Sequence, residues 1–248
     1  MEQETVLISG GAKRLGRAIA LNCAQFGANV AITYRTSEDE AQQVIEELHE
    51  VGTGAQRFAA FKADVSRGED VEKLADEVLQ TFGAVTALVN NAAIFRRTPF
   101  EAMTESDFDD HIAANLKGPY LMSKTFGEIF LNQGRGSILN IADIYGLRPL
   151  KNYIPYCISK AGVVMLTEAL AKALAPQVRV NCICPGTILL PSEVQGDNED
   201  EEETLVARIP MERLGTPEEI AETARFLLFG PGFITGAVLP VDGAQRLK

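Results

Sequence analysis

Short runs of apolar, mostly β-branched residues recur along the chain and alternate with stretches whose apolar positions follow a helical period. The runs occupy residues 5–9, 29–34, 56–62, 87–90, 136–141, 178–183 and 237–241. They are apolar through most of their length, as is typical of strands that are covered on both faces. Strands that alternate with helices predict right-handed crossovers and a parallel, doubly wound sheet of about seven strands. We therefore expect a single α/β domain over residues 1–248.

The predicted helices carry their own start signals. From Val71 to Phe82, apolar residues at i, i+3, i+4, i+7, i+8 and i+11 form one stripe of a helix. Three segments have the pattern of capping boxes, in which a hydroxyl and an acid three residues later cap the first helical turn. They are Ser66–Glu69, Thr104–Asp107 and Thr216–Glu219, the last with Pro217 at the first helical position.

The composition excludes several classes of function. A formal net charge of −11 argues against nucleic acid or an anionic membrane as a main partner. No apolar run approaches the roughly 20 residues of a membrane helix, and the first residues show no leader, so we expect a cytoplasmic protein. The four cysteines lack paired spacing and the chain has two histidines, so we expect free thiols and no metal site.

A glycine-rich turn follows the first predicted strand. It runs from Ser9 to Gly16 with the sequence SGGAKRLG, and a helix is predicted to begin within it. Glycines at such a turn let the backbone approach a pyrophosphate, which then lies on the helix N-terminus. A tight turn without a ligand has the same composition, so this motif alone is a weak signal.

The end of the second predicted strand indicates which dinucleotide would bind. NAD-binding proteins often have an acid there that bonds the adenosine ribose. This chain instead has Tyr34-Arg35-Thr36-Ser37, with no acid. Arg35 would pair with a 2′-phosphate, helped by the two hydroxyls and by Lys13; the alternative is a solvated surface charge. We therefore expect NADPH/NADP+ as the cofactor.

From Ser9 to Gly243 the chain resembles the short-chain dehydrogenase/reductase family. The matching motifs are the glycine turn, Asp64, Asn90-Asn91-Ala92, Asn115, Tyr156-x-x-x-Lys160, Pro185-Gly186 and Thr235-Gly236…Val241-Asp242-Gly243. The resemblance implies a single-domain Rossmann-type fold that binds the cofactor. The residues expected to contact it are Ser9, Gly10, Lys13, Arg14, Leu15, Gly16, Tyr34, Arg35, Thr36, Ser37, Asp64, Val65, Asn91, Ala92, Tyr156, Lys160, Pro185 and Gly186.

Tyr156 and Lys160 lie four residues apart on a predicted helix and therefore share a face. The pKa of a free tyrosine is about 10, and an ammonium beside it would lower that pKa toward the range useful for general acid catalysis. By resemblance, Tyr156 donates the proton, Lys160 also holds the nicotinamide ribose, and Asn115 anchors a water relay. Asp64 would touch the adenine. These residues predict an NADPH-dependent oxidoreductase.

One position departs from the common family pattern. Thirteen residues before the tyrosine, where most members carry a serine that bonds a substrate carbonyl, this chain has Asp143. An ionised carboxylate there would oppose a developing alkoxide by about 4 kcal/mol at roughly 4 Å and an effective dielectric of about 20. The same group suits a C=N substrate, whose ring nitrogen an acid can help to protonate.

An aspartate, a tyrosine and a lysine form the catalytic set of the pteridine reductase branch of the family, which this chain resembles. Arg14 replaces the middle glycine of the turn, as in that branch, where the arginine reaches cofactor phosphate and pterin. Phe95 falls where those enzymes stack an aromatic ring on the pterin, an interaction worth about 0.5–1.5 kcal/mol. The branch usually has a serine where this chain has Ala93. We therefore predict reduction of a dihydropterin or dihydrofolate-type C=N. The expected substrate contacts are Arg14, Ala93, Phe95, Asp143, Tyr153 and Tyr156.

Two other functions remain open. A carbonyl reductase or dehydrogenase for a 3-oxoacyl, sugar or steroid substrate would make Asp143 dispensable. A non-catalytic sensor would bind NADPH without turning over any substrate.

Residues 187–215 are expected to form a lid over the substrate. This segment contains six acids within residues 197–203. Such a run is ordinarily a solvated face; alternatively it repels polyanions, which would favour a small neutral or cationic ring as substrate. The resemblance also implies a homotetramer, for which the apolar helix at 161–175 and the run at 238–241 are candidate interfaces, unless both pack internally.

Overall fold

The computed structural model describes residues 3–188 and 199–248. Within them, seven parallel strands form one sheet in the order β3-β2-β1-β4-β5-β6-β7. The strands are β1 (Thr5–Ile8), β2 (Asn29–Tyr34), β3 (Phe58–Lys62), β4 (Ala87–Asn90), β5 (Gly136–Ile141), β6 (Val178–Pro185) and β7 (Val238–Val241). The predicted single-domain, doubly wound Rossmann-type fold is confirmed.

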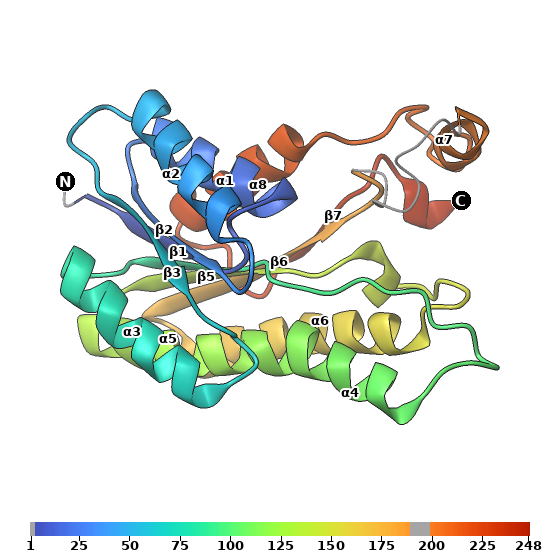
Figure 1. Cartoon of the computed structure of the whole chain (residues 1–248), viewed down its shortest axis with the longest axis horizontal. Coiled ribbons are helices and arrows are strands. Elements are labelled where there is room, and N and C mark those ends of the chain that lie inside the picture. The colour runs from blue at the N-terminus through green and yellow to red at the C-terminus, as the bar shows by residue number, and fades with distance from the viewer. Residues whose placement is uncertain (1–2, 189–198) are drawn as a thin grey trace.

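Helices cover both faces of the sheet (Figure 1). The helices are α1 (Arg14–Gln25), α2 (Glu38–Val51), α3 (Gly68–Phe82), α4 (Glu105–Ile112), α5 (Gly118–Gln133), α6 (Ile154–Leu174), α7 (Glu199–Val206) and α8 (Pro217–Phe229). In Figure 1, α1, α2 and α8 lie above the sheet, and α3, α5 and α6 lie below it. Short helical turns η1 (Ala113–Lys117), η2 (Ile144–Gly146) and η3 (Gln245–Leu247) complete the described elements.

Each face of the sheet has its own apolar core, and this explains the unbroken apolar strands. In β1, Val6 and Ile8 pack toward α1 and α2, whereas Leu7 packs toward α3 and α5. All three side chains are fully buried. Alternate side chains of a strand point to opposite faces, so a sheet that is covered on both faces needs apolar residues at every position of its strands.

Two of the three predicted capping boxes form, and one does not. The hydroxyls of Thr104 and Thr216 accept bonds from the backbone N–H three residues later, and the acid there bonds back. The box at Ser66 was a wrong prediction: α3 has Arg67 at its N-cap position, with no side-chain cap. The Ser66 hydroxyl instead donates to Asp64 Oδ1 at 2.7 Å, so a nearer acceptor competes with the helix end.

The strand order reverses direction around β1, whose neighbours are β2 on one side and β4 on the other. Ligands of open α/β sheets bind outside the carboxyl ends of the strands at such a switch point. Here the Ser9 hydroxyl, directly after β1, accepts bonds from the backbone N–H groups of Asn91 and Ala92, directly after β4, at 2.9 and 3.1 Å. The two loops that border the switch point are therefore fastened to each other.

The predicted lid is described in part. Residues 189–198, including the first two positions of the acidic run, lie outside the described residues, and α7 covers Glu199–Val206. In residues 3–188 and 199–248, no helix has both the length and the apolar character to cross a membrane.

Candidate active site

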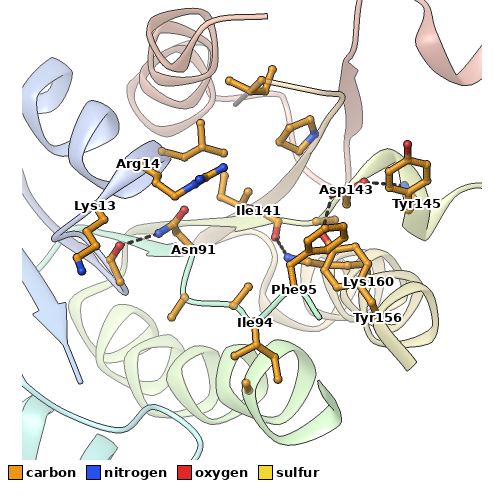
Figure 2. Close-up of a pocket in the computed structure, with 18 of the residues that line it drawn as sticks. Lys13, Arg14, Asn91, Ile94, Phe95, Ile141, Asp143, Tyr145, Tyr156 and Lys160 are labelled. Atoms are coloured by element: carbon orange, nitrogen blue, oxygen red, sulfur yellow. Dashed lines mark hydrogen bonds between the residues drawn. The ribbon is translucent and has the colours of Figure 1, made fainter. Parts of the chain in front are cut away.

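A pocket of about 900 Å³ opens at the carboxyl ends of the strands. It brings together nearly all the residues that the sequence predicts for cofactor and substrate, several of which are drawn in Figure 2. The predicted residues that line it are Gly10, Lys13, Arg14, Leu15, Tyr34, Arg35, Thr36, Ser37, Asp64, Val65, Asn91, Ala92, Ala93, Phe95, Asp143, Tyr153, Tyr156, Lys160, Pro185 and Gly186. Three predicted residues do not line the pocket but support residues that do. Ser9 and Asn115 bond to the backbone of lining residues, and Gly16 packs closely against the backbone of Gly10.

The glycine turn has the shape that a pyrophosphate needs. Gly10 has a φ of +63°, and a Cβ on it would lie 3.0 Å from Ala92 Cα. A Cβ on Gly16 would lie 2.3 Å from the Gly10 carbonyl oxygen. The backbone can therefore turn tightly into α1, whose first N–H groups face the pocket end of the turn. These residues fit the diphosphate of a dinucleotide.

Arg14 is held in an uncommon backbone conformation. Its φ is +51°, in the left-handed region that favours glycine and costs other residues about 1–3 kcal/mol. Its side chain lines the pocket between the glycine turn and the catalytic residues (Figure 2). The strain at this position gives a physical reason to assign the guanidinium a ligand-binding role.

The cations expected to bind a 2′-phosphate lie at the rim of the pocket and have acidic partners there. Lys13 Nζ is 2.7 Å from Glu40 Oε1, and Arg35 Nη1 is 3.9 Å from Asp64 Oδ2. The Arg35 side chain is 62% exposed. Burial alone would raise the pKa of Asp64, but hydrogen bonds from Ser66 and the charge of Arg35 outweigh it and lower that pKa. Both cations are therefore placed where an incoming phosphate can reach them.

Asn115 lies in the π-helical turn η1, which continues α4. Single π-turns inside helices are frequent at functional sites. The Asn115 amide oxygen accepts from the backbone N–H of Ile94 at 2.7 Å, and its nitrogen donates to the Ile94 carbonyl at 2.9 Å and to Ser159 Oγ at 3.1 Å. Asn115 thus joins the loop after β4 to the catalytic helix α6. The water relay that the resemblance implies for it stays a prediction.

Asp143 and Tyr156 form a direct hydrogen bond at the floor of the pocket (Figure 2). The Tyr156 hydroxyl donates to Asp143 Oδ2 at 2.7 Å. The other carboxyl oxygen accepts the backbone N–H of Tyr145 at 2.8 Å, which makes Asp143 the N-cap of η2. Lys160 Nζ donates to the Ile141 carbonyl at 2.8 Å and lies 5.8 Å from the centroid of the Tyr156 ring.

The ionisation of this cluster differs from what the sequence predicts. We expected Lys160 to lower the pKa of Tyr156, but burial and then the charge of Asp143 raise it well above its usual value. Burial also raises the pKa of Asp143 and outweighs the opposing bond from Tyr156. Burial lowers the pKa of Lys160. Desolvation disfavours every charged form here, so the cluster favours a neutral phenol and shifts the Asp143 carboxyl group toward its protonated form.

An aromatic wall stands above the pair. The ring of Phe95 stacks on that of Tyr153, with centroids 4.5 Å apart and planes 12° apart, and meets the Tyr156 ring edge-on at 4.7 Å. Phe95 is 40% exposed. This wall gives a flat apolar surface beside the proton donor, on which a planar group of a substrate can lie.

Several lining residues escaped the sequence reasoning. Leu150 adds apolar surface and Tyr145 adds a polar group, whereas Ile188 and Arg208 belong to the predicted lid segment. Only Tyr145 had a signal, since it follows Asp143 by two residues. Ser159, which bonds Asn115, could also have been found from its place beside Lys160. Thr204, Leu205 and Arg208 border the pocket as a lid segment would.

Within residues 3–188 and 199–248, no group of three or more histidine, cysteine or acidic side chains could hold a metal ion. The residues that bear on the chemistry of the pocket are the Asp143, Tyr156 and Lys160 cluster and the dinucleotide cradle.

Comparison with known proteins identifies the family. The sequence model of a family described as enoyl-(acyl carrier protein) reductase matches residues 10–244. A 3-oxoacyl-[acyl-carrier-protein] reductase, FabG, from Staphylococcus epidermidis is 34% identical over 246 residues, which cover 98% of this chain and 99% of the relative. An uncharacterized oxidoreductase from Thermotoga maritima is 36% identical over 249 residues, 98% of this chain and 97% of the relative.

Solved structures agree with the sequence relatives. A variant of actinorhodin polyketide ketoreductase, solved with NADPH, superposes with a TM-score of 0.92 at 28% identity and covers 100% of this chain and 98% of its own. Levodione reductase gives a TM-score of 0.91 at 30% identity, with 98% of each chain covered. The chain therefore belongs to the short-chain dehydrogenase/reductase family and is a nicotinamide-dependent oxidoreductase.

Proposed function

We propose that the chain is an NADPH-dependent carbonyl reductase that acts on a small ketone, with the 3-oxoacyl class as the first candidate. The observation that carries the proposal is the pair of Tyr156 and Asp143, 2.7 Å apart, which places two hydrogen-bonding groups at one point of the pocket floor. Three of the relatives support a carbonyl substrate, since they are a 3-oxoacyl reductase, a polyketide ketoreductase and levodione reductase.

Tyr156 and Lys160 have separate roles in the reduction of a carbonyl. When bound, the nicotinamide supplies a hydride to the carbonyl carbon. Tyr156, kept as a neutral phenol by its raised pKa, donates its proton to the carbonyl oxygen as charge develops there. Lys160 places a positive charge behind the phenol ring and steadies the phenolate that remains.

Asp143 can play the part of the family serine when its carboxyl group is protonated. A protonated carboxyl group has one O–H donor, as a serine hydroxyl does. Because burial raises the pKa of Asp143, its neutral form is favoured relative to an exposed aspartate. In its neutral form, Asp143 can donate a second hydrogen bond to the carbonyl oxygen without the repulsion expected of a carboxylate.

A dihydropterin-type C=N is the second candidate, and Phe95 favours it. Its ring, stacked parallel to Tyr153 at 4.5 Å and next to Tyr156, offers a planar heterocycle a surface beside the proton donor. FabG, the polyketide ketoreductase and levodione reductase are named for carbonyl substrates, so these relatives support the ketone. The pterin prediction of the sequence thus ranks second.

NADPH rather than NADH is proposed from the rim of the pocket. Replacing Arg35 with aspartate is expected to lower the ratio of kcat/KM for NADPH to that for NADH at least about tenfold, because a charged hydrogen bond to the 2′-phosphate is lost and a repulsion is added. Lys73→Asp, the same charge change at an exposed site on α3, serves as the control. An unchanged ratio in Arg35→Asp would contradict the 2′-phosphate role.

The substrate is tested with the wild-type protein and NADPH against an acetoacetyl thioester, small cyclic and open-chain ketones, and a dihydropterin. We expect the ketones or the thioester to be reduced and the dihydropterin to react slowly. Reduction of the dihydropterin alone would transfer the assignment to the second candidate. Tight NADPH binding without any turnover would favour a sensor.

A further inference from the structure

The last residues of the chain fasten three walls of the pocket together. We call residues 242–248 the C-terminal clasp; they follow β7 and include η3. Figure 1 shows the C-terminus beside α7. Asp242 stabilises the clasp from within, because its two carboxyl oxygens accept the backbone N–H groups of Ala244 and Arg246, each at 3.0 Å.

Gln245 connects the clasp to the loop after β6. It is a polar side chain with 6% exposure. Its Oε1 accepts the backbone N–H of Thr187 at 2.9 Å, and its Nε2 donates to the Thr187 hydroxyl at 3.0 Å. Gly186 is packed so closely that a Cβ on it would lie 2.8 Å from Gln245 Oε1. The amide thus fixes the backbone of a segment whose residues 185–188 line the pocket.

Arg148 holds the clasp from the catalytic side. Its Nη1 donates to the carbonyl oxygens of Gln245, Arg246 and Lys248, at 3.2, 2.7 and 2.9 Å. Arg148 follows Asp143 by five residues. Burial raises the pKa of the neighbouring Tyr145 phenol, and the positive charge of Arg148 partly opposes that rise. The clasp is therefore tied to the loop that carries the catalytic carboxyl group.

The third tie reaches the base of the lid segment. The backbone N–H of Met211 donates to the Gly243 carbonyl at 3.3 Å, and Lys248 Nζ donates to the Ala207 carbonyl. Gly243 has a φ of +55°, and a Cβ on it would lie 2.8 Å from the side chain of Ile209. The end of α7 and the residues after it thus rest on the clasp.

The position of these walls relative to the ligand follows from the strand order. The adenosine end of a dinucleotide would lie near β2, where Arg35 is, and its reactive end near Tyr156 and the carboxyl end of β5. β6 is the next strand beyond β5, so residues 185–187 border the reactive end. Gln245 and Arg148 are remote from the adenosine end.

We propose that Gln245, held by Arg148, is a positioning residue for the nicotinamide half of the coenzyme site. Gln245 holds the loop after β6 in place relative to the loop that carries Asp143. It thereby fixes the width of the space between these two loops, into which the nicotinamide must fit. This inference rests on the proposed use of NADP(H) but not on the identity of the reduced substrate.

The test compares a whole coenzyme with a ligand that has only its adenosine end. Gln245→Met keeps the volume and removes both bonds to Thr187, and Arg148→Met removes the three bonds to the clasp. Dissociation constants are measured calorimetrically for NADP+ and for 2′,5′-ADP. We expect each variant to weaken NADP+ binding about tenfold, as the loss of two or more hydrogen bonds implies, and to leave 2′,5′-ADP binding unchanged. Gln133→Met, at an exposed position ending α5, should change neither.

Other outcomes overturn the inference in distinguishable ways. Equal weakening of both ligands would mean that the clasp serves only general stability, and unchanged NADP+ binding would mean that it positions nothing. If Gln245→Met unfolds, Arg148→Met decides, because Arg148 is exposed. A wild-type chain that binds neither ligand would overturn the proposed NADP(H) function and this inference together.

Discussion

Replacing Tyr156 with phenylalanine is expected to lower kcat about 10³-fold while NADPH still binds. The substitution removes one hydroxyl, and with it the proton donor, whose role in general acid catalysis is worth roughly 10²–10⁴-fold. The ring remains to pack edge-on against Phe95, so the aromatic wall keeps its shape. The measurement is single-turnover reduction of the best ketone, followed through the absorbance of the reduced nicotinamide.

Tyr120→Phe is the matched control for this prediction. Tyr120 is 50% exposed on α5, and we expect its loss to leave kcat within a factor of about two. A Tyr156→Phe variant that retains a tenth or more of the wild-type kcat would show that another group, or solvent, delivers the proton.

The second large effect concerns Asp143. Asp143→Ala is expected to lower kcat for a ketone about 10²-fold, the usual cost of removing one donor from a developing oxyanion. Asp143→Ser should lose much less, because a serine hydroxyl both donates to the carbonyl and can serve as the N-cap of η2. With a dihydropterin, both variants should fail, because neither supplies a carboxylic acid. Ketone turnover that is abolished equally by both substitutions would contradict the serine-like role.

The pH profile gives an independent check on the same residue. Burial raises the pKa of Asp143 in the folded protein, and the proposed role needs the protonated form. Activity on a ketone should therefore be greatest below that raised pKa and fall as the pH rises through it. Asp143→Ser has no titrating group there and should lose this alkaline limb. An identical limb in both proteins would assign the titration to another group.

Most of the sheet was predictable because burial on both faces leaves an unbroken apolar signature. β2, β4 and β5 have the predicted bounds. β3 starts later than predicted, at Phe58, for a physical reason. Gln56 turns its amide toward the carbonyl oxygens of Ala24 and Ala28, which it bonds at 2.6 and 2.8 Å. It thereby satisfies one carbonyl group in the last turn of α1 and one just after the helix. A hydropathy profile of the sequence does not reveal that role.

The sequence predicts the parts of the candidate site that one local motif determines. It does not predict the parts that form where distant segments of the chain meet. Tyr156 and Lys160 follow from helical spacing, and the glycine turn from its backbone freedom. The direction of the Tyr156 pKa was not predictable, because it depends on how deeply the pocket buries the phenol and on the bond to Asp143. Gln245 was missed because its partner Thr187 is 58 residues away.

The bond from the backbone of Asn91 to the Ser9 hydroxyl joins positions 82 residues apart, and this has a consequence for how the protein matures. A nascent chain that does not yet include β4 contains the glycine turn but cannot hold it against the loop after that strand. Coenzyme should therefore bind only after the central strands have joined the sheet, and binding then adds about 2.7 kcal/mol of stability at a ligand concentration of roughly 100 times Kd. Bound dinucleotide would thus lower the population of the unfolded, protease-sensitive chain.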